Sequence, residues 1–162
     1  REPGMTTEER AALIAQYKVG YNAVLEALDG ITEAEWDSRE GPEEWSTREI
    51  VHHLGDSEMG AAVRIRMLVA EAEPVVMAYD ERRWTERLYT AERPIPESMA
   101  AFQAARNATA PLLDLMTDEE WTRPGRHSER GAMTAETWLE WYGPHAHDHA
   151  DQIRRARAAA HG

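Results

Sequence analysis

The 162-residue sequence contains no cysteine, and this absence excludes several kinds of chemistry at once. The protein can form no disulfide framework, and it supplies no thiolate to bind a metal ion or to act as a nucleophile. Lys18 is the only lysine, so Schiff-base chemistry has a single candidate with no supporting residue around it. Any reaction that uses a thiol must therefore take that thiol from outside the protein.

Long apolar runs and excess positive charge are also missing. No stretch approaches the roughly 20 apolar residues that cross a bilayer, and no signal peptide is visible. The formal net charge is −12 at pH 7, and such a surface repels nucleic-acid phosphates and anionic lipids. We therefore expect a cytoplasmic protein with a small-molecule substrate, and we expect neither nucleic acid nor a membrane as a partner.

What the sequence does contain is a set of capped amphipathic stretches in a chain of single-domain length. The spacing of Thr6 to Glu9, and of Ser46 to Glu49, is that of capping boxes at helix starts. Apolar residues then recur with helical spacing over about 7–28, 47–72, 96–116 and 134–156. The sequence thus predicts an all-α protein, one four-helix bundle domain over residues 5–162.

Two prolines lie inside these helical patterns. Pro111 is expected to kink or interrupt the third helix near residues 107–110. Pro144 is expected either to kink the fourth helix or to restart it at its first position, and residues 145–156 stay helical in both cases.

The two halves of the chain also resemble each other. Residues 28–36 are similar to residues 113–121, and each segment follows a helix and precedes a long connector to the next one. This repeat predicts two related halves with pseudo-twofold symmetry. The connector over residues 73–95 is long enough to cross the bundle or to cover a site.

The strongest candidates for a functional site lie near the C-terminus, in His145-Ala146-His147-Asp148-His149. In a helix, His145 and His149 are four residues apart on one face, whereas His147 points elsewhere. The same face carries apolar residues and one amide: Trp138, Trp141, Gln152, Ile153 and Ala156. Two buried imidazoles leave polar nitrogens to satisfy, which a hydrogen-bonded pair or a shared metal ion can do.

Three further histidines differ in what they offer. His53 borders the apolar stripe of the second helix, one turn from Ile50 and Ser57, so a bundle interior could use it. His52 points to the opposite side and is expected to be a solvated surface residue. His127 lies in the polar connector 117–132 and is expected to be exposed.

Three segments together resemble the DinB/YfiT-like superfamily. The connector segment Tyr79-Asp80-Glu81-x-x-Trp84 is similar to that of the YfiT-like branch. The other two motifs are Trp45-Ser46-x-x-Glu49-Ile50-x-x-His53-Leu54 and His145-x-x-x-His149-x-x-Gln152-Ile153. The likeness extends over nearly the whole chain from the first helix onward, and Pro144, directly before a candidate ligand, is a departure from the pattern.

This resemblance implies a four-helix bundle of up-down-down-up order with a long crossover connector. It also implies one divalent metal ion bound by three histidines, which by position are His53, His145 and His149. Zinc or nickel suits such a ligand set, because three neutral imidazoles leave coordination positions open for water or substrate.

The resemblance leaves three functions open. The YfiT-like branch includes bacillithiol S-transferases, and a related branch contains mycothiol-dependent isomerases. We therefore expect a metal-dependent enzyme that transfers a low-molecular-weight thiol to an electrophilic substrate. A metal-dependent hydrolase using the same site is the first alternative, and a metal-stabilised bundle that binds a ligand without catalysis is the second.

The sequence names candidates around the metal but no catalytic residue. Side chains expected to line the pocket are Tyr79, Asp80, Trp84 and Gln152. Arg82 or Arg83 could meet a carboxylate of the thiol cofactor, with ordinary surface charges as the alternative. A homodimer is expected because related proteins often pair through bundle faces and tryptophan is abundant here, although the high net charge opposes association.

Overall fold

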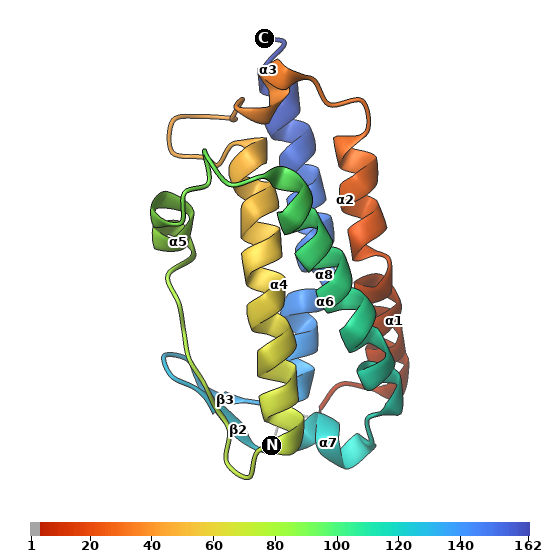
Figure 1. Ribbon diagram of the computed structural model, residues 1–162. Helices are drawn as coiled ribbons and strands as arrows, with labels where there is room; N and C mark the ends of the chain where they lie inside the picture. Colours follow the sequence, from red (N-terminus) through yellow and green to blue (C-terminus); the bar gives the residue numbers. More distant parts are fainter. Residues whose placement is uncertain (1–3) are drawn as a thin grey trace.

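A computed structural model describes residues 4–162 of the protein and shows an elongated helical bundle (Figure 1). Its long helices are α1 (Thr7–Lys18), α2 (Gly20–Leu28), α4 (Thr47–Ala70), α6 (Ile95–Leu115) and α8 (Ala135–Ala159). Three short helices, α3 (Glu33–Trp36), α5 (Glu81–Arg87) and α7 (Asp118–Thr122), lie in the connections. The predicted all-α, four-helix architecture is confirmed, with α1 and α2 together forming one of the four columns.

The direction of the chain along the bundle follows the order that the resemblance implied. In Figure 1 the chain rises through α1 and α2, descends α4, returns across the bundle and descends α6, then rises through α8. Because α4 and α6 run in the same direction, the connection between them has to travel the length of the bundle. That connection holds α5, and its residues Ala78, Tyr79 and Glu81 line a cavity together with His145.

The sequence-predicted helix starts are confirmed. The Thr6 and Ser46 hydroxyls accept hydrogen bonds from the amides of Glu9 and Glu49, and both glutamate side chains complete their capping boxes. The internal repeat has a structural counterpart, because α3 and α7 each begin at a Thr-x-x-Glu segment whose glutamate accepts a hydrogen bond from the threonine amide, Thr32 to Glu35 and Thr117 to Glu120. These reciprocal bonds satisfy amides that a helix start otherwise leaves without partners.

The first predicted helix, 7–28, is broken in two at Val19. A side chain at Gly20 would place its Cβ 2.5 Å from Nη1 of Arg106 and 2.9 Å from Cβ of Ala146. Arg106 also donates a 2.6 Å hydrogen bond to the carbonyl of Tyr17 at the break. The break therefore lets a buried arginine of α6 reach the backbone of the first column, a tertiary contact that local periodicity does not reveal.

Both helices with internal prolines are continuous. α6 runs through Pro111 and α8 runs through Pro144, so neither an interruption nor a restart occurs, and the expected helix over residues 145–156 is confirmed. The alternative expectation, a kink at each proline, stays a prediction. Proline leaves the carbonyl four residues earlier without a helical partner. Those residues, Asn107 and Glu140, are exposed, so water can satisfy the free carbonyls and the helix need not end.

A small sheet joins the two connectors that the sequence analysis treated as irregular. Its strands are β1 (Val75–Val76), β2 (Gly125–His127) and β3 (Gly131–Met133), with β1 parallel to β2 and β2 antiparallel to β3. Strands of two or three residues are too short to show an alternating pattern. The sheet fixes the β2–β3 loop against α8 and makes no more than an edge of the core.

The core consists of two apolar clusters along the bundle axis. One surrounds Trp138, Leu68 and Trp121, and the other surrounds Ile50, Phe102 and Ile153. The helices α4, α6 and α8 also bury polar side chains. Within residues 4–162, no helix is both long enough and apolar enough to cross a membrane.

Candidate metal centre

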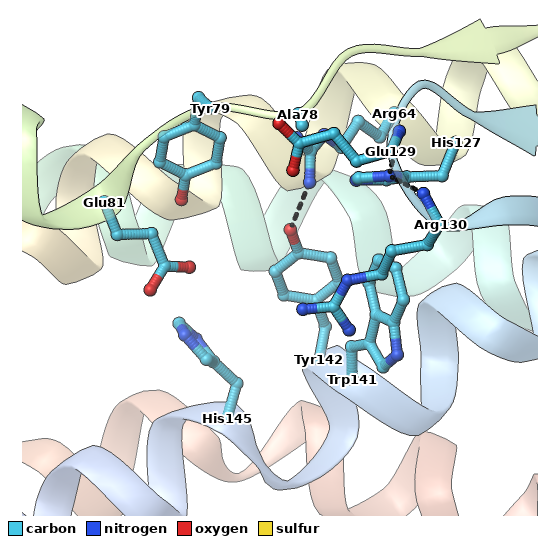
Figure 2. A pocket seen from close by; sticks show the side chains of 10 residues that line it. All are labelled: Arg64, Ala78, Tyr79, Glu81, His127, Glu129, Arg130, Trp141, Tyr142 and His145. Atoms are coloured by element: carbon cyan, nitrogen blue, oxygen red, sulfur yellow. Dashed lines mark hydrogen bonds between the residues drawn. The ribbon is translucent and has the colours of Figure 1, made fainter.

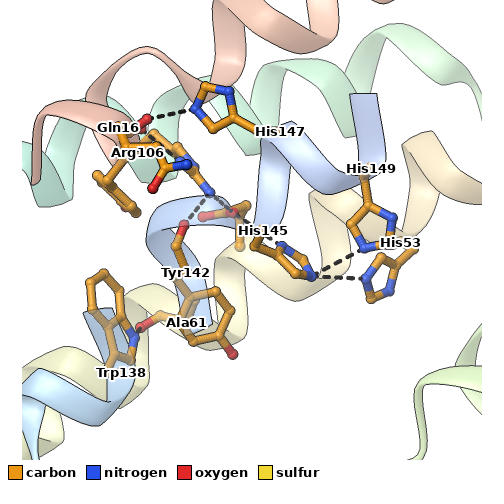
Figure 3. Close-up of polar contacts among 11 residues, drawn as sticks. Gln16, His53, Ala61, Arg106, Trp138, Tyr142, His145, His147 and His149 are labelled. Atoms are coloured by element: carbon orange, nitrogen blue, oxygen red, sulfur yellow. Dashed lines mark hydrogen bonds and ion pairs between the residues drawn. The ribbon is translucent and has the colours of Figure 1, made fainter. Parts of the chain in front are cut away.

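Three histidines from two helices converge on one point (Figure 3). Nε2 of His145 lies 3.4 Å from Nε2 of His53 and 3.2 Å from Nε2 of His149. One ligand atom from each of the three falls within 4.8 Å of the others. The four-residue spacing on α8 supplies two of these side chains, and α4 supplies the third from the facing column.

The outer nitrogens of two of these rings face hydrogen-bond acceptors. Nδ1 of His149 is 2.8 Å from Oε1 of Gln152, one turn further along α8. Nδ1 of His145 is 3.9 Å from Oε1 of the buried Glu58. A proton on each Nδ1 is therefore favoured, and in a neutral ring this leaves a lone pair on Nε2.

This arrangement fits a bound cation. Lone pairs that face one another at 3.2–3.4 Å repel unless a proton or a metal ion lies between them. An acceptor beside the second ring nitrogen is the usual support of a histidine ligand. Gln152 supplies one for His149 at 2.8 Å, and Glu58 lies 3.9 Å from Nδ1 of His145. The donor set of three imidazoles suits zinc, nickel and similar divalent ions.

Burial keeps the imidazoles in the form that binds metal. Burial lowers the pKa of His53 to about 2, and the neighbouring His149 and His145 add to the effect. Burial also lowers the pKa of His149 to about 4, with His145 contributing. Trp45 lies against this pair, its ring centroid 4.7 Å from that of His53, and shields it from water. Neutral rings at physiological pH need lose no proton to bind a cation.

A buried ion pair stands behind His145. Glu58 and Arg106 are 2.7 Å apart, with side chains 0% and 3% exposed. Burial alone would raise the pKa of Glu58, but the neighbouring His145 ring and the charge of Arg106 outweigh it and hold that pKa below its usual value. Arg106 also donates to the carbonyls of Tyr17 and Tyr142. The pair thereby ties α1, α4, α6 and α8 together at the level of the site.

Arg106 was missed by sequence reasoning, although a signal exists. It lies on the apolar stripe of α6, four residues after Phe102 and three before Thr109, and all three are buried. A charged residue on a core-facing stripe needs a buried partner. Glu58 on the core face of α4 is that partner.

A cavity of about 200 Å³ opens beside His145 (Figure 2). Of the sequence-predicted pocket residues, only Tyr79 lines it. Asp80 is exposed and caps α5 by accepting a hydrogen bond from the amide of Arg83, and the next residue, Glu81, lines the cavity instead. Trp84 packs on Tyr79 with ring centroids 4.3 Å apart and faces a separate apolar groove.

The other candidates lie elsewhere. Gln152 holds the ring of His149 and does not line the cavity. Arg82 is exposed and paired with Glu43 and Glu86, at 2.7 Å and 3.2 Å. Arg83 is exposed on α5. The structure thus brings neither arginine into the cavity, because both project from the outer face of a short helix.

Two histidines predicted to be exposed are buried, and both predictions were wrong. His52 is fully buried, with Nδ1 2.7 Å from the hydroxyl of Ser98, because α6 packs closely on α4 at this level. Gly55 permits that approach, since a Cβ there would lie 2.8 Å from the Ser98 carbonyl. His127 is buried on β2. His147 points away from the metal site, as expected, with Nε2 2.8 Å from the carbonyl of Gln16.

Comparison with known proteins identifies the family and supports the arrangement of the helices. A family model of the DinB superfamily matches residues 16–153. A protein of Oceanobacillus iheyensis named "Putative metal-dependent hydrolase" is 31% identical over 109 residues, which are 67% of this chain and 63% of that protein. The "Putative metal-dependent hydrolase YfiT" of Bacillus subtilis is 29% identical over 129 residues, 79% of this chain and 72% of its own length.

A solved structure extends the likeness to three dimensions. YfiT from Bacillus subtilis superimposes with a TM-score of 0.85 at 27% identity, covering 94% of this chain and 87% of that chain. That structure is described as a "probable metal-dependent hydrolase with an unusual four-helix bundle topology". The chain belongs to the DinB superfamily. The similar proteins named above are called putative metal-dependent hydrolases.

Proposed function

We propose that the protein is a metal-dependent enzyme that transfers a low-molecular-weight thiol to an electrophilic substrate. The observation that carries this proposal is the convergence of three Nε2 atoms, from His53, His145 and His149, beside an open cavity. Zinc or nickel would be held by these three residues. A divalent cation bound there would lower the pKa of a coordinated thiol or water, so that a nucleophile is available near neutral pH.

The residues around the site have distinct tasks in such a reaction. Gln152 and Glu58 orient two of the ligand rings, and Trp45 keeps water away from the third. The cavity beside His145 seats the electrophile next to the reacting sulfur. The sulfur forms a bond to an electrophilic carbon, the leaving group departs with its electron pair, and the thiol proton passes to solvent. Because the chain contains no cysteine, the thiol in this proposal is a diffusible molecule, and the family resemblance suggests one of the bacillithiol or mycothiol type.

Hydrolysis at the same site is the second candidate, supported by the names of the relatives. Water would then replace the thiol as nucleophile and cleave an ester or amide. A metal-stabilised bundle that binds a ligand without turnover is the third reading.

One set of assays separates these readings. Zinc- or nickel-loaded protein is mixed with 1-chloro-2,4-dinitrobenzene, with and without bacillithiol or mycothiol, and separately with p-nitrophenyl acetate without thiol. We expect turnover of the chloride that needs both metal and thiol, and that His53→Ala abolishes. Release of p-nitrophenol without thiol would identify a hydrolase, and no turnover under any condition would favour the binding module.

A further inference from the structure

The cavity beside His145 is lined by two arginines, Arg64 and Arg130, which the metal site itself does not use (Figure 2). Arg64 projects from α4 and Arg130 from the loop between β2 and β3. His127 and Tyr142 lie between them and also line the cavity. None of these four side chains was a sequence-predicted pocket residue.

Arg64 is a half-buried cation without a carboxylate partner. Its guanidinium donates to the hydroxyl of Tyr142 at 3.2 Å and to the carbonyl of Met77, and it lies 5.2 Å from the centre of the Tyr79 ring. No ion pair among residues 4–162 includes Arg64. A partly desolvated cation with only neutral partners attracts any anion that can enter its cavity.

Arg130 is the other arginine that lines the cavity, and it too makes no ion pair with a carboxylate among residues 4–162. Its guanidinium lies 4.9 Å from the centre of the Trp141 ring, which holds it over the cavity. Both arginines act on His127, whose pKa is lowered by burial first and then by the charges of Arg64 and Arg130. Both cations therefore act at this wall of the cavity, where the charge of Glu129 opposes them.

The neutral groups between the arginines are set as donors. Nδ1 of His127 accepts hydrogen bonds from the amides of Glu129 and Arg130, each at 3.2 Å, so the proton of the neutral ring is on Nε2. The Tyr142 hydroxyl already accepts from Arg64 and has its own proton left to donate. Two cations and two neutral donors thus line one cavity, together with the carboxylates of Glu81 and Glu129.

We propose that this cavity binds the carboxylate of a small organic acid, and that the reacting part of the same molecule extends toward His53, His145 and His149. The inference rests on the proposed function for the second half of that statement. A planar carboxylate matches the paired donors of a guanidinium. Glu81 and Glu129 also line the cavity, so a singly charged anion is favoured over doubly charged phosphate. The volume of about 200 Å³ equals that of roughly seven water molecules, which suits a small acid.

The test measures binding and does not depend on turnover. Benzoate is titrated calorimetrically into zinc-loaded protein and into chelator-treated protein, with benzamide as the uncharged analogue and inorganic phosphate as the alternative anion. Chelator treatment removes direct coordination of the carboxylate by the metal. Arg64→Met, Arg64→Lys and Arg130→Met are compared with Arg126→Met, which removes an exposed arginine of β2 outside the cavity. Melting temperatures establish that each variant is folded.

We expect one benzoate per chain in both preparations, with dissociation constants at least tenfold higher in Arg64→Met and Arg130→Met and unchanged in Arg126→Met. The dissociation constant of Arg64→Lys should lie between these two values, because lysine keeps the charge and loses the paired donors. Benzamide and phosphate should bind at least tenfold more weakly than benzoate. The proposal would be overturned if Arg126→Met weakened benzoate binding as much as the cavity variants do, or if Arg64→Met and Arg130→Met left it unchanged. A preference for phosphate over benzoate would also overturn it. Intact benzoate binding in a protein without turnover would contradict the proposed function alone.

Discussion

Nδ1 of His145 lies 3.9 Å from the buried carboxylate of Glu58, which is itself paired with Arg106. This relationship connects the stability of the bundle with the orientation of a metal ligand. An ion pair that serves only packing can be replaced by apolar side chains with little loss, whereas one that orients a ligand cannot. The two roles can therefore be separated by experiment.

Glu58→Met alone should leave the Arg106 charge buried without a partner and cost about 3–5 kcal/mol in the free energy of unfolding. The double variant Glu58→Met/Arg106→Met should recover most of that loss. Zinc affinity should fall about 10–100-fold in both variants, because the support of His145 is missing in both. Denaturant unfolding measures the free energy of unfolding, and competition with a zinc indicator measures zinc affinity. A double variant with wild-type zinc affinity would show that Glu58 has no positioning role.

Gln152 makes a matched prediction on the other α8 ligand. Gln152→Leu removes the acceptor for Nδ1 of His149 and should lower zinc affinity about tenfold or more, with little change in stability because Gln152 is only partly buried. Gln152→Glu keeps an acceptor at the same place and should retain the affinity. If the leucine and glutamate variants bind zinc equally, the hydrogen bond between Gln152 and His149 does not contribute to zinc affinity.

The metal-free site should make stability depend on pH. His53 and His149 have folded pKa values of about 2 and about 4, whereas the unfolded value is near 6.5. As pH falls below about 6.5, the unfolded chain takes up protons that the folded chain refuses, so stability decreases toward pH 4. The contribution of the two rings approaches about 2.7 kcal/mol per pH unit in this range.

Other histidines also titrate there, so the reading is a difference between proteins. Chelator-treated wild type is compared with His53→Gln and His149→Gln in unfolding experiments from pH 7.5 to 4.5. Each substitution should flatten the curve by about one proton's slope. Curves that stay parallel to the wild type would show that these rings are protonated in the folded protein.

The expected homodimer remains a prediction. It depends on exposed apolar side chains, and Val63 and Met59 on α4 are two that the bundle leaves at 58% and 49% exposure. Sedimentation velocity at micromolar concentration should give a dimer, and Val63→Glu should shift it toward monomer if this face takes part. A monomeric wild type would remove the prediction.

The helices and the pairing of His145 with His149 on one face could be predicted because their signals are local, whereas the convergence of His53 with them was implied by the resemblance. Capping boxes at Thr6 and Ser46, helical periodicity, and the spacing of His145 to His149 each lie within a few residues. The position of His53 beside its apolar stripe was enough to place it inside the bundle. These features need no knowledge of which helix faces which.

What the sequence analysis missed depends on contacts between distant segments. His52 is buried because α6 packs against the other side of α4, and His127 is buried because two short strands from separate connectors meet. The break at Val19 exists for Arg106, 87 residues later in the sequence numbering. Asp80 is the N-cap of α5, and Glu81, the first residue of that helix, lines the cavity in its place. None of these partners can be read from neighbouring residues.

The measurement that tests the account most directly is the metal content of purified protein and of its histidine variants, after zinc loading and desalting. Wild type should hold one zinc ion per chain, His53→Ala should hold almost none, and His147→Ala should match the wild type because that ring faces Gln16. His52→Ala should also keep its metal, although losing the Ser98 contact should lower its melting temperature. Equal loss of metal in His53→Ala and His147→Ala, or full occupancy in both, would contradict the three-histidine site.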